Sequence, residues 1–173
     1  MSELFSIQLQ NRQQQGRDGV WLDLPTTTEQ VQAALRQIGI SSDNPQGLFI
    51  SGYFAEEEKR FAIPYNMVLA SNVDELNFLA SRLETLSTGE RAELNAALQA
   101  PQSELFSIGR ITDFPENVDY YVHLPDVRGP AQLGDYYLNR SGMVDMPDEW
   151  KGGINTAQFG RFVAQQEQGA FTQ

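Results

Sequence analysis

The segment from residue 112 to residue 126, TDFPENVDYYVHLPD, combines side chains that could do acid–base chemistry. It holds the only histidine of the chain, His123, and no lysine or arginine, together with four acids: Asp113, Glu116, Asp119 and Asp126. An imidazole or a carboxylate can act as a general acid or base, and a pair of carboxylates can hydrolyse glycosides. The alternative is that the negative charge itself forms the working surface.

The sequence argues against the first interpretation, a catalytic site. A catalytic carboxylic acid needs an apolar setting that raises its pKa, and no Asp or Glu of this sequence lies in one. The motifs GxxxxGK, GxGxxG, HExxH and GxSxG and the EF-hand loop are also missing from the sequence. His123 follows Val122 and precedes Leu124, so in a strand it would share a side with Tyr121, and we interpret it as a structural hydrogen-bonding residue. We therefore expect no enzyme, and a two-carboxylate hydrolase is the third alternative.

Composition limits the other classes of function. The 173 residues include no cysteine and one histidine, which excludes disulfides, thiolate metal sites and a multi-histidine centre. We expect no cofactor and no metal. No stretch is apolar over the length that a signal peptide or a membrane helix needs, so a cytoplasmic protein is expected.

The chain has an excess of acid that is unevenly distributed. Its 23 acids and 12 bases give a net charge of −11, which argues against direct binding of nucleic acid. Between residues 113 and 149 there are eight acids and two bases, Arg128 and Arg140. The simplest interpretation of such an excess is solubility. The other is a binding surface made of these eight acids: Asp113, Glu116, Asp119, Asp126, Asp135, Asp145, Asp148 and Glu149.

The first part of the chain, residues 1–66, is predicted to form antiparallel strands with one helix. The helix spans 26–39, where Thr26 and Glu29 have the spacing of a capping box and Gly39 can end the helix. Pro64 would restrict the last strand to a sheet edge. Alternation of apolar and polar residues indicates strands at 4–10, 20–24, 47–54 and 61–65.

The second part, residues 67–109, is predicted to be helical and the third, residues 110–173, to mix strands and helices. In the second part, Ser71 or Asn72 caps one helix and Ser87 with Glu90 forms a capping box on the next. A short helical turn should end at Gly109. In the third part we expect strands at 110–115 and 119–125, a helix opening at Pro130, a bend at 151–155, and a last helix starting at Asn155 or Thr156. Its inward side would carry Phe159, Phe162, Val163 and Gln166. The fold class is therefore α+β, in three small domains.

Three segments together resemble one family. They are GVWLDLPTTTEQVQAALRQIG at 19–39, NVDELNFLASRLETLSTGERAELNAAL at 72–98 and INTAQFGRFVAQQEQGAFT at 154–172. Their order and spacing are similar to those of the ArdA-type antirestriction proteins over nearly the whole chain. The closing signature of that family resembles Phe159, Gly160 and Arg161, followed by Gly169, Phe171 and Thr172.

The resemblance implies a fold and a function. Members of the family are encoded on conjugative transposons, other mobile genetic elements and phages, and they inhibit type I restriction-modification enzymes in the bacterial cytoplasm. They are elongated proteins of three small domains, usually homodimers, whose acidic surface is a mimic of bent B-form DNA. We interpret Gly160 and Arg161 of the closing signature as structural residues, at a packing contact, and not as a binding site.

In this interpretation the eight acids stand in for phosphates and occupy the basic cleft of the target, so that the counterions released by DNA are released by the protein. Four tyrosines would hold the backbone that presents them, as core or partly core residues: Tyr120, Tyr121, Tyr136 and Tyr137. Two alternatives stay open. One is an inhibitor of another DNA-binding defence enzyme, such as a CRISPR effector. The other is an interaction module that binds through an apolar patch.

Overall fold

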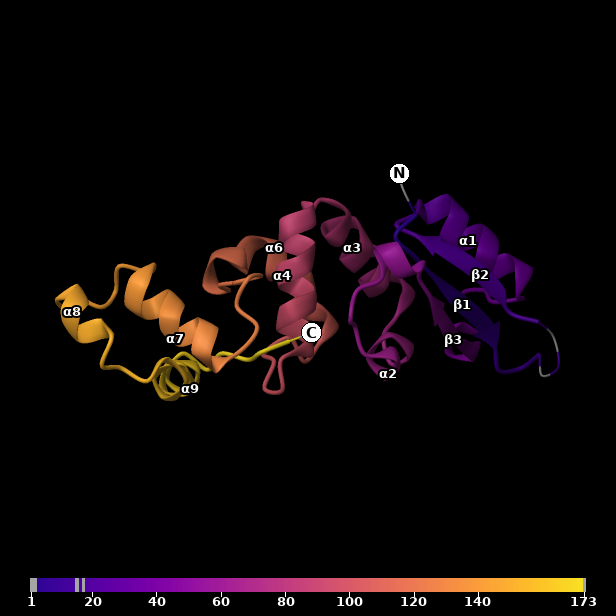
Figure 1. Cartoon of the computed structure of the whole chain (residues 1–173). Helices are drawn as coiled ribbons and strands as arrows, with labels where there is room; N and C mark the ends of the chain where they lie inside the picture. The colour runs from indigo at the N-terminus through magenta and orange to yellow at the C-terminus, as the bar shows by residue number, and fades with distance from the viewer. Residues whose placement is uncertain (1–2, 15, 17, 173) are drawn as a thin grey trace. The chain divides into compact units, whose positions relative to one another are not determined.

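The computed structural model of this α+β protein describes residues 3–14, 16 and 18–172. It divides into two compact units, whose elements are drawn in Figure 1. Unit 1 consists of Met1–Leu98 and Glu104–Tyr121, and unit 2 of Gln99–Ser103 and Val122–Gln173. The fold class predicted from the sequence is confirmed. The division into three domains and the elongated shape stay predictions.

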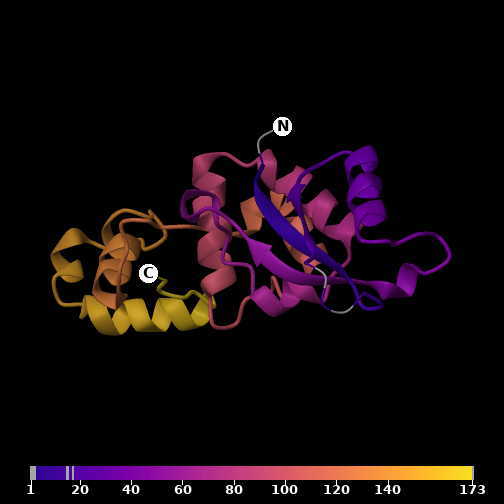
Figure 2. The same cartoon turned by 90° about the vertical axis from the view of Figure 1, so that its right-hand side faces the viewer.

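Unit 1 contains an antiparallel sheet of three strands, which confirms three of the predicted strands. Strand β1 (Phe5–Asn11) lies between β2 (Val20–Leu24) and β3 (Leu48–Phe54). Phe5, Ile7 and Leu9 of β1 are buried while the residues between them are half-buried, because alternate side chains of a strand point to opposite faces. In Figure 2 the strands lie in front of the helices that cover the buried face.

The predicted fourth strand, at 61–65, is wrong. Phe61 and Ile63 are both buried, as alternation suggested, but the backbone N–H of Ala62 donates to Asn95 Oδ1 at 2.8 Å instead of to a strand. Pro64 then precedes a short helix, α2 (Tyr65–Leu69). Two 3-10 turns, Pro45–Gly47 and Glu57–Lys59, flank β3 along the chain.

Three longer helices complete most of unit 1. Helix α1 (Thr28–Gln37) has its capping box at Thr27 and Gln30, one residue later than predicted, and ends before Gly39 at φ +72°. Asn72 caps α3 (Val73–Glu84), and Ser87 with Glu90 forms the predicted capping box of α4 (Thr88–Gln99). The core between these helices and the sheet includes fully buried leucines: Leu24, Leu76, Leu79, Leu83 and Leu94.

The strands predicted at 110–115 and 119–125 are wrong. The segment forms α5 (Ile108–Thr112), α6 (Phe114–Asn117) and a 3-10 turn, η3 (Val118–Tyr120). Ser107 starts α5 by accepting the N–H of Arg110 at 3.3 Å, so Gly109 lies inside the helix and does not end it. Ile108, Ile111 and Phe114 are buried at three-residue spacing, which is the spacing of a helix face.

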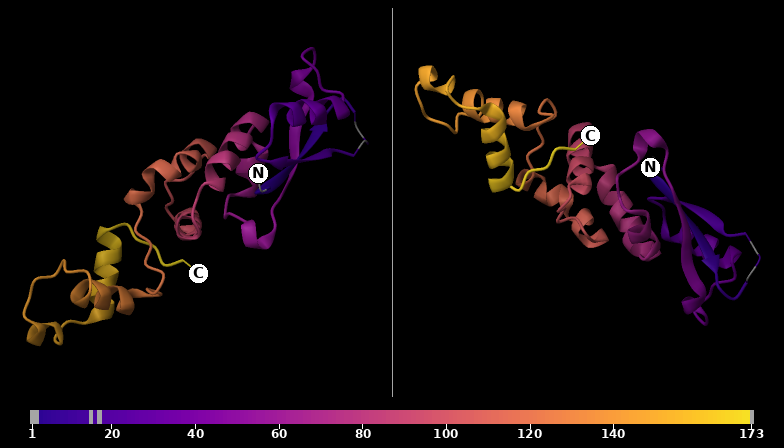
Figure 3. Two further views of the ribbon diagram at one scale, coloured as in Figure 1. Left: turned by 90° about the horizontal axis from the view of Figure 1, so that it is seen from above. Right: turned by 60° about the horizontal axis from the view of Figure 1, so that its bottom comes forward.

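Unit 2 is built around two helices that cross at glycines. Helix α7 (Pro130–Asn139) opens at Pro130 and α9 (Thr156–Gln166) is capped by Asn155, both as predicted. They lie beside one another in both views of Figure 3. A β-carbon at Gly134 would lie 2.7 Å from the carbonyl carbon of Thr156, so glycine permits the close approach. A short helix, α8 (Asp148–Lys151), precedes the bend.

The inward side predicted for α9 is partly wrong. Gly160 and Val163 are buried, but the side chain of Phe162 is 58% exposed and Gln166 is exposed. Gly160 faces α7. Since each residue turns an α-helix by about 100°, Phe162 lies about 200° further round the axis and faces away from α7. The close approach of Gly160 to the backbone of Pro130 and Gly134 agrees with the structural role expected for it. Among the described helices, none has both the length and the apolar character required to cross a lipid bilayer.

Candidate functional site

All eight acids of the predicted surface are exposed, and both units carry some of them. Asp113, Glu116 and Asp119 belong to unit 1, and the other five to unit 2: Asp126, Asp135, Asp145, Asp148 and Glu149. The structure therefore brings the acids to the surface of each unit.

In unit 1 the acids sit on the short helices that follow α4. Asp113 is the residue between α5 and α6, and its carbonyl oxygen accepts Asn117 Nδ2 at 2.9 Å. Glu116 of α6 receives Arg82 Nη2 of α3 at 2.7 Å on Oε1. This ion pair links α6 to α3, while the segment itself is anchored by its buried side chains, Ile111 and Phe114.

In unit 2 two of the acids also have cationic partners. Asp148 lies 2.8 Å from Lys151 Nζ, one helical turn away, and this hydrogen bond and the charge of Lys151 hold the pKa of Asp148 below its usual value. Asp135 accepts Asn139 Nδ2 at 2.8 Å and lies 4.0 Å from Arg140 Nη2.

His123 and the tyrosines lie differently from the prediction. His123 is half-buried in the irregular segment after η3, and in the described part of the chain its ring makes no hydrogen bond, so the expected structural bond is not observed. Tyr120 is 85% exposed, so its assignment to the core is wrong. Tyr121 is half-buried against Phe114, with their ring centroids 5.2 Å apart. Tyr136 and Tyr137 of α7 are also half-buried, and their ring centroids are 5.6 Å apart.

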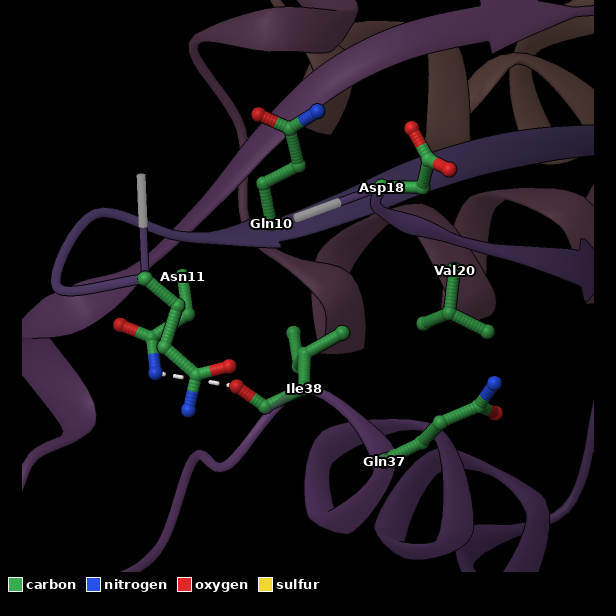
Figure 4. A pocket seen from close by; sticks show the side chains of 7 residues that line it. Gln10, Asn11, Asp18, Val20, Gln37 and Ile38 are labelled. Carbon is green, nitrogen blue, oxygen red and sulfur yellow. Dashed lines mark hydrogen bonds between the residues drawn. The ribbon is translucent and has the colours of Figure 1, made fainter. Parts of the chain in front are cut away.

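A small hollow lies at the end of β1 and beside α1, away from the acids of residues 113–149 along the chain. Figure 4 shows Asn11 reaching toward Ile38, and Asn11 Nδ2 donates to the carbonyl oxygen of Ile38 at 3.0 Å. The lining is mostly amide side chains: Gln10, Asn11, Gln14, Asp18, Val20, Gln37 and Ile38. The buried Asn11 thus joins the strand to the helix, a role that the sequence analysis did not identify because the two segments are far apart in the chain.

The fold and the exposed acids define a class of protein. The chain is an α+β protein that presents an acid-rich segment as exposed carboxylates on short helices and turns. A family model described as antirestriction protein (ArdA) matches residues 15–173, and the chain belongs to that family. Membership implies an antirestriction function, exerted on restriction enzymes as an inhibitor. No curated protein matches the chain.

Proposed function

We propose that this protein is a DNA mimic that occupies the DNA-binding cleft of a type I restriction-modification enzyme and blocks it. The observation that supports this proposal is the exposure of all eight carboxylates between residues 113 and 149 in a member of an antirestriction family. An acid in this segment that packed into the core could not meet a cation of another protein. None of the eight acids packs into the core.

The physical basis is electrostatic. Exposed carboxylates carry negative charge, as the phosphates of DNA do, so an acidic surface can occupy a basic cleft in place of DNA. Duplex DNA carries one charge per about 1.7 Å, so the net charge of −11 corresponds to about 19 Å of duplex. A homodimer would double that length, and we propose a dimer acting in the bacterial cytoplasm as the working form.

A second candidate function is supported by the exposed aromatic side chains. Tyr120 is 85% and Trp150 67% exposed, and large exposed rings are common anchors of protein interfaces. The protein would then be an interaction module that binds its partner through apolar contacts. A third candidate keeps the charged surface but directs it at another DNA-binding defence enzyme, such as a CRISPR effector.

The test is a displacement titration. A type I enzyme is loaded with fluorescently labelled duplex DNA, and the purified protein is added at increasing ratio in low salt. We expect the DNA to be released stoichiometrically. A control variant with all eight acids replaced by Asn or Gln should release none at the same ratios. No displacement by the unmodified protein would rule out the type I enzyme as the target.

A further inference from the structure

The eight exposed acids fall into two groups by their partners. Three of them lie within 4.0 Å of a lysine or arginine nitrogen: Glu116, Asp135 and Asp148. For the other five, no ion pair is present among residues 3–14, 16 and 18–172: Asp113, Asp119, Asp126, Asp145 and Glu149. The difference is therefore one of charge compensation, because all eight are exposed.

The cations of the two short ion pairs are held by the fold. The side chain of Lys151 is only 18% exposed while that of Asp148 is 92% exposed, and Arg82 is 32% exposed beside a 70% exposed Glu116. Each of these two cations is thus less exposed than the acid that it pairs with. Arg140 is less constrained at 4.0 Å from Asp135, but its guanidinium also lies over the ring of Tyr136, 5.5 Å from the centroid.

A paired carboxylate is a poor substitute for a phosphate. Two opposite charges 2.7 to 4.0 Å apart act at a distance as a dipole, whose potential falls off faster than that of a single charge. An approaching arginine or lysine of the target would also meet the protein's own cation, and like charges repel. An unpaired carboxylate presents its full charge to the same arginine or lysine.

We propose that the five unpaired carboxylates contact the cations of the target, and that the three paired carboxylates are neutralised within the protein and do not. This inference rests on the proposed function, and it divides the acidic surface into contacting and non-contacting residues. The contacting set is Asp113, Asp119, Asp126, Asp145 and Glu149.

Two variants with equal net charge test the division. The pair-deleted variant removes three pairs: Arg82→Gln with Glu116→Gln, Arg140→Gln with Asp135→Asn, and Lys151→Gln with Asp148→Asn. The contact-deleted variant removes three unpaired acids and three cations elsewhere: Asp113→Asn, Asp119→Asn and Asp145→Asn with Arg12→Gln, Arg36→Gln and Arg60→Gln. Each loses three acids and three bases, so both keep the net charge of −11.

The measurement is the concentration that displaces half of the labelled duplex from a type I enzyme. We expect the pair-deleted variant to stay within about threefold of the unmodified protein and the contact-deleted variant to be weakened at least about tenfold, as expected for loss of several cross-interface charge contacts. Equal weakening of both variants, or a larger effect of pair deletion, would overturn the division. If the unmodified protein displaces no DNA, the proposed function fails and this inference fails with it.

Folding is controlled by circular dichroism and thermal unfolding of each variant. Should a sixfold variant unfold, the comparison is repeated with two double variants that both keep the net charge: Lys151→Gln with Asp148→Asn against Arg128→Gln with Asp145→Asn. The division predicts that only the second weakens displacement. Weakening by the first to the same extent would contradict it.

Discussion

Gly160 of α9 lies directly against Pro130 in the first turn of α7. A β-carbon at position 160 would lie 2.7 Å from the carbonyl carbon of Pro130 and 2.8 Å from the backbone nitrogen of Gly134. Both obstacles are backbone atoms, so Gly160→Ala must push the helices apart. We expect a loss of about 1–3 kcal/mol in the free energy of unfolding, measured by urea denaturation.

The matched control for Gly160 is Gly152→Ala. Gly152 has a φ of −63°, and no atom lies within 4 Å of the position that its β-carbon would occupy. The free energy of unfolding should change by less than about 0.5 kcal/mol. Equal effects of the two substitutions would show that the close crossing of α7 and α9 does not stabilise unit 2.

Asn11 should contribute to stability through its side-chain hydrogen bonds, which include a longer one from Nδ2 to the carbonyl oxygen of Gly39 at 3.4 Å. It is 7% exposed, donates from Nδ2 to the carbonyl oxygen of Ile38 and accepts the N–H of Gln13 on Oδ1, both at 3.0 Å. Asn11→Ala removes the partner of the buried carbonyl oxygen of Ile38, which costs about 1–3 kcal/mol. The free energy of unfolding from urea denaturation checks this. Asn66→Ala, at an exposed position of α2, is the control and should be nearly neutral.

The pKa of Glu90 should depend on Ser87. The Ser87 hydroxyl, and next its backbone N–H, donate to the Glu90 carboxylate and lower its pKa from the ordinary 4.5. Since the pKa is lowered in the folded state, the resulting stability is present above pH 4.5 and is lost as the pH falls through the folded pKa. Ser87→Ala removes the larger cause, so the pKa of Glu90, measured by NMR titration, should rise toward 4.5.

The control for Glu90 is Ser81→Ala, because the Ser81 hydroxyl donates to the carbonyl oxygen of Phe78 and does not touch Glu90. It should leave the pKa of Glu90 where it is. A pKa of Glu90 that does not move in the Ser87→Ala variant would show that the capping box does not stabilise the ionised carboxylate.

Substitution of two exposed aromatic residues, Tyr120 and Trp150, distinguishes binding through charge from binding through an apolar interface. If charge is the working surface, Trp150→Ala and Tyr120→Ala should each change the displacement of DNA by less than about threefold. An interface anchored on these rings would lose about 30-fold or more from a single change, as hot-spot residues do. Displacement titration of the two variants therefore distinguishes the proposed mimic from the interaction module.

The elements that the sequence predicted correctly are those specified by neighbouring residues. The capping residues Asn72, Ser87 and Asn155 lie directly before their helices, and Pro130 opens α7. The alternation in β1 is likewise a local pattern. Such signals need no knowledge of distant contacts, because a cap or a strand face is decided within a few residues.

The misassigned segments depend on partners that are distant in sequence. The backbone N–H of Ala62 donates to the side chain of Asn95, so the segment at 61–65 does not pair with a strand. Residues 110–115 form helix because Ile111 and Phe114 pack into the unit 1 core, and short apolar runs do not distinguish a strand from a buried helix.

The candidate site was predictable only in part. That the acids are exposed follows from their type, since isolated carboxylates are rarely buried. The pair between Arg82 and Glu116 joins residues 34 positions apart. No local pattern could therefore indicate that Glu116 is compensated and that Asp113 and Asp119 are not.

The central claim is that charge carries the inhibition, and salt dependence tests it most directly. The affinity of the protein for a type I enzyme is measured from roughly 50 to 200 mM salt, beside the variant with all eight acids neutralised. For about five charge contacts we predict a loss of affinity of about a hundredfold or more over this range, and little binding by the variant at any salt. An affinity that is unchanged by salt and retained by the variant would contradict the DNA-mimic account.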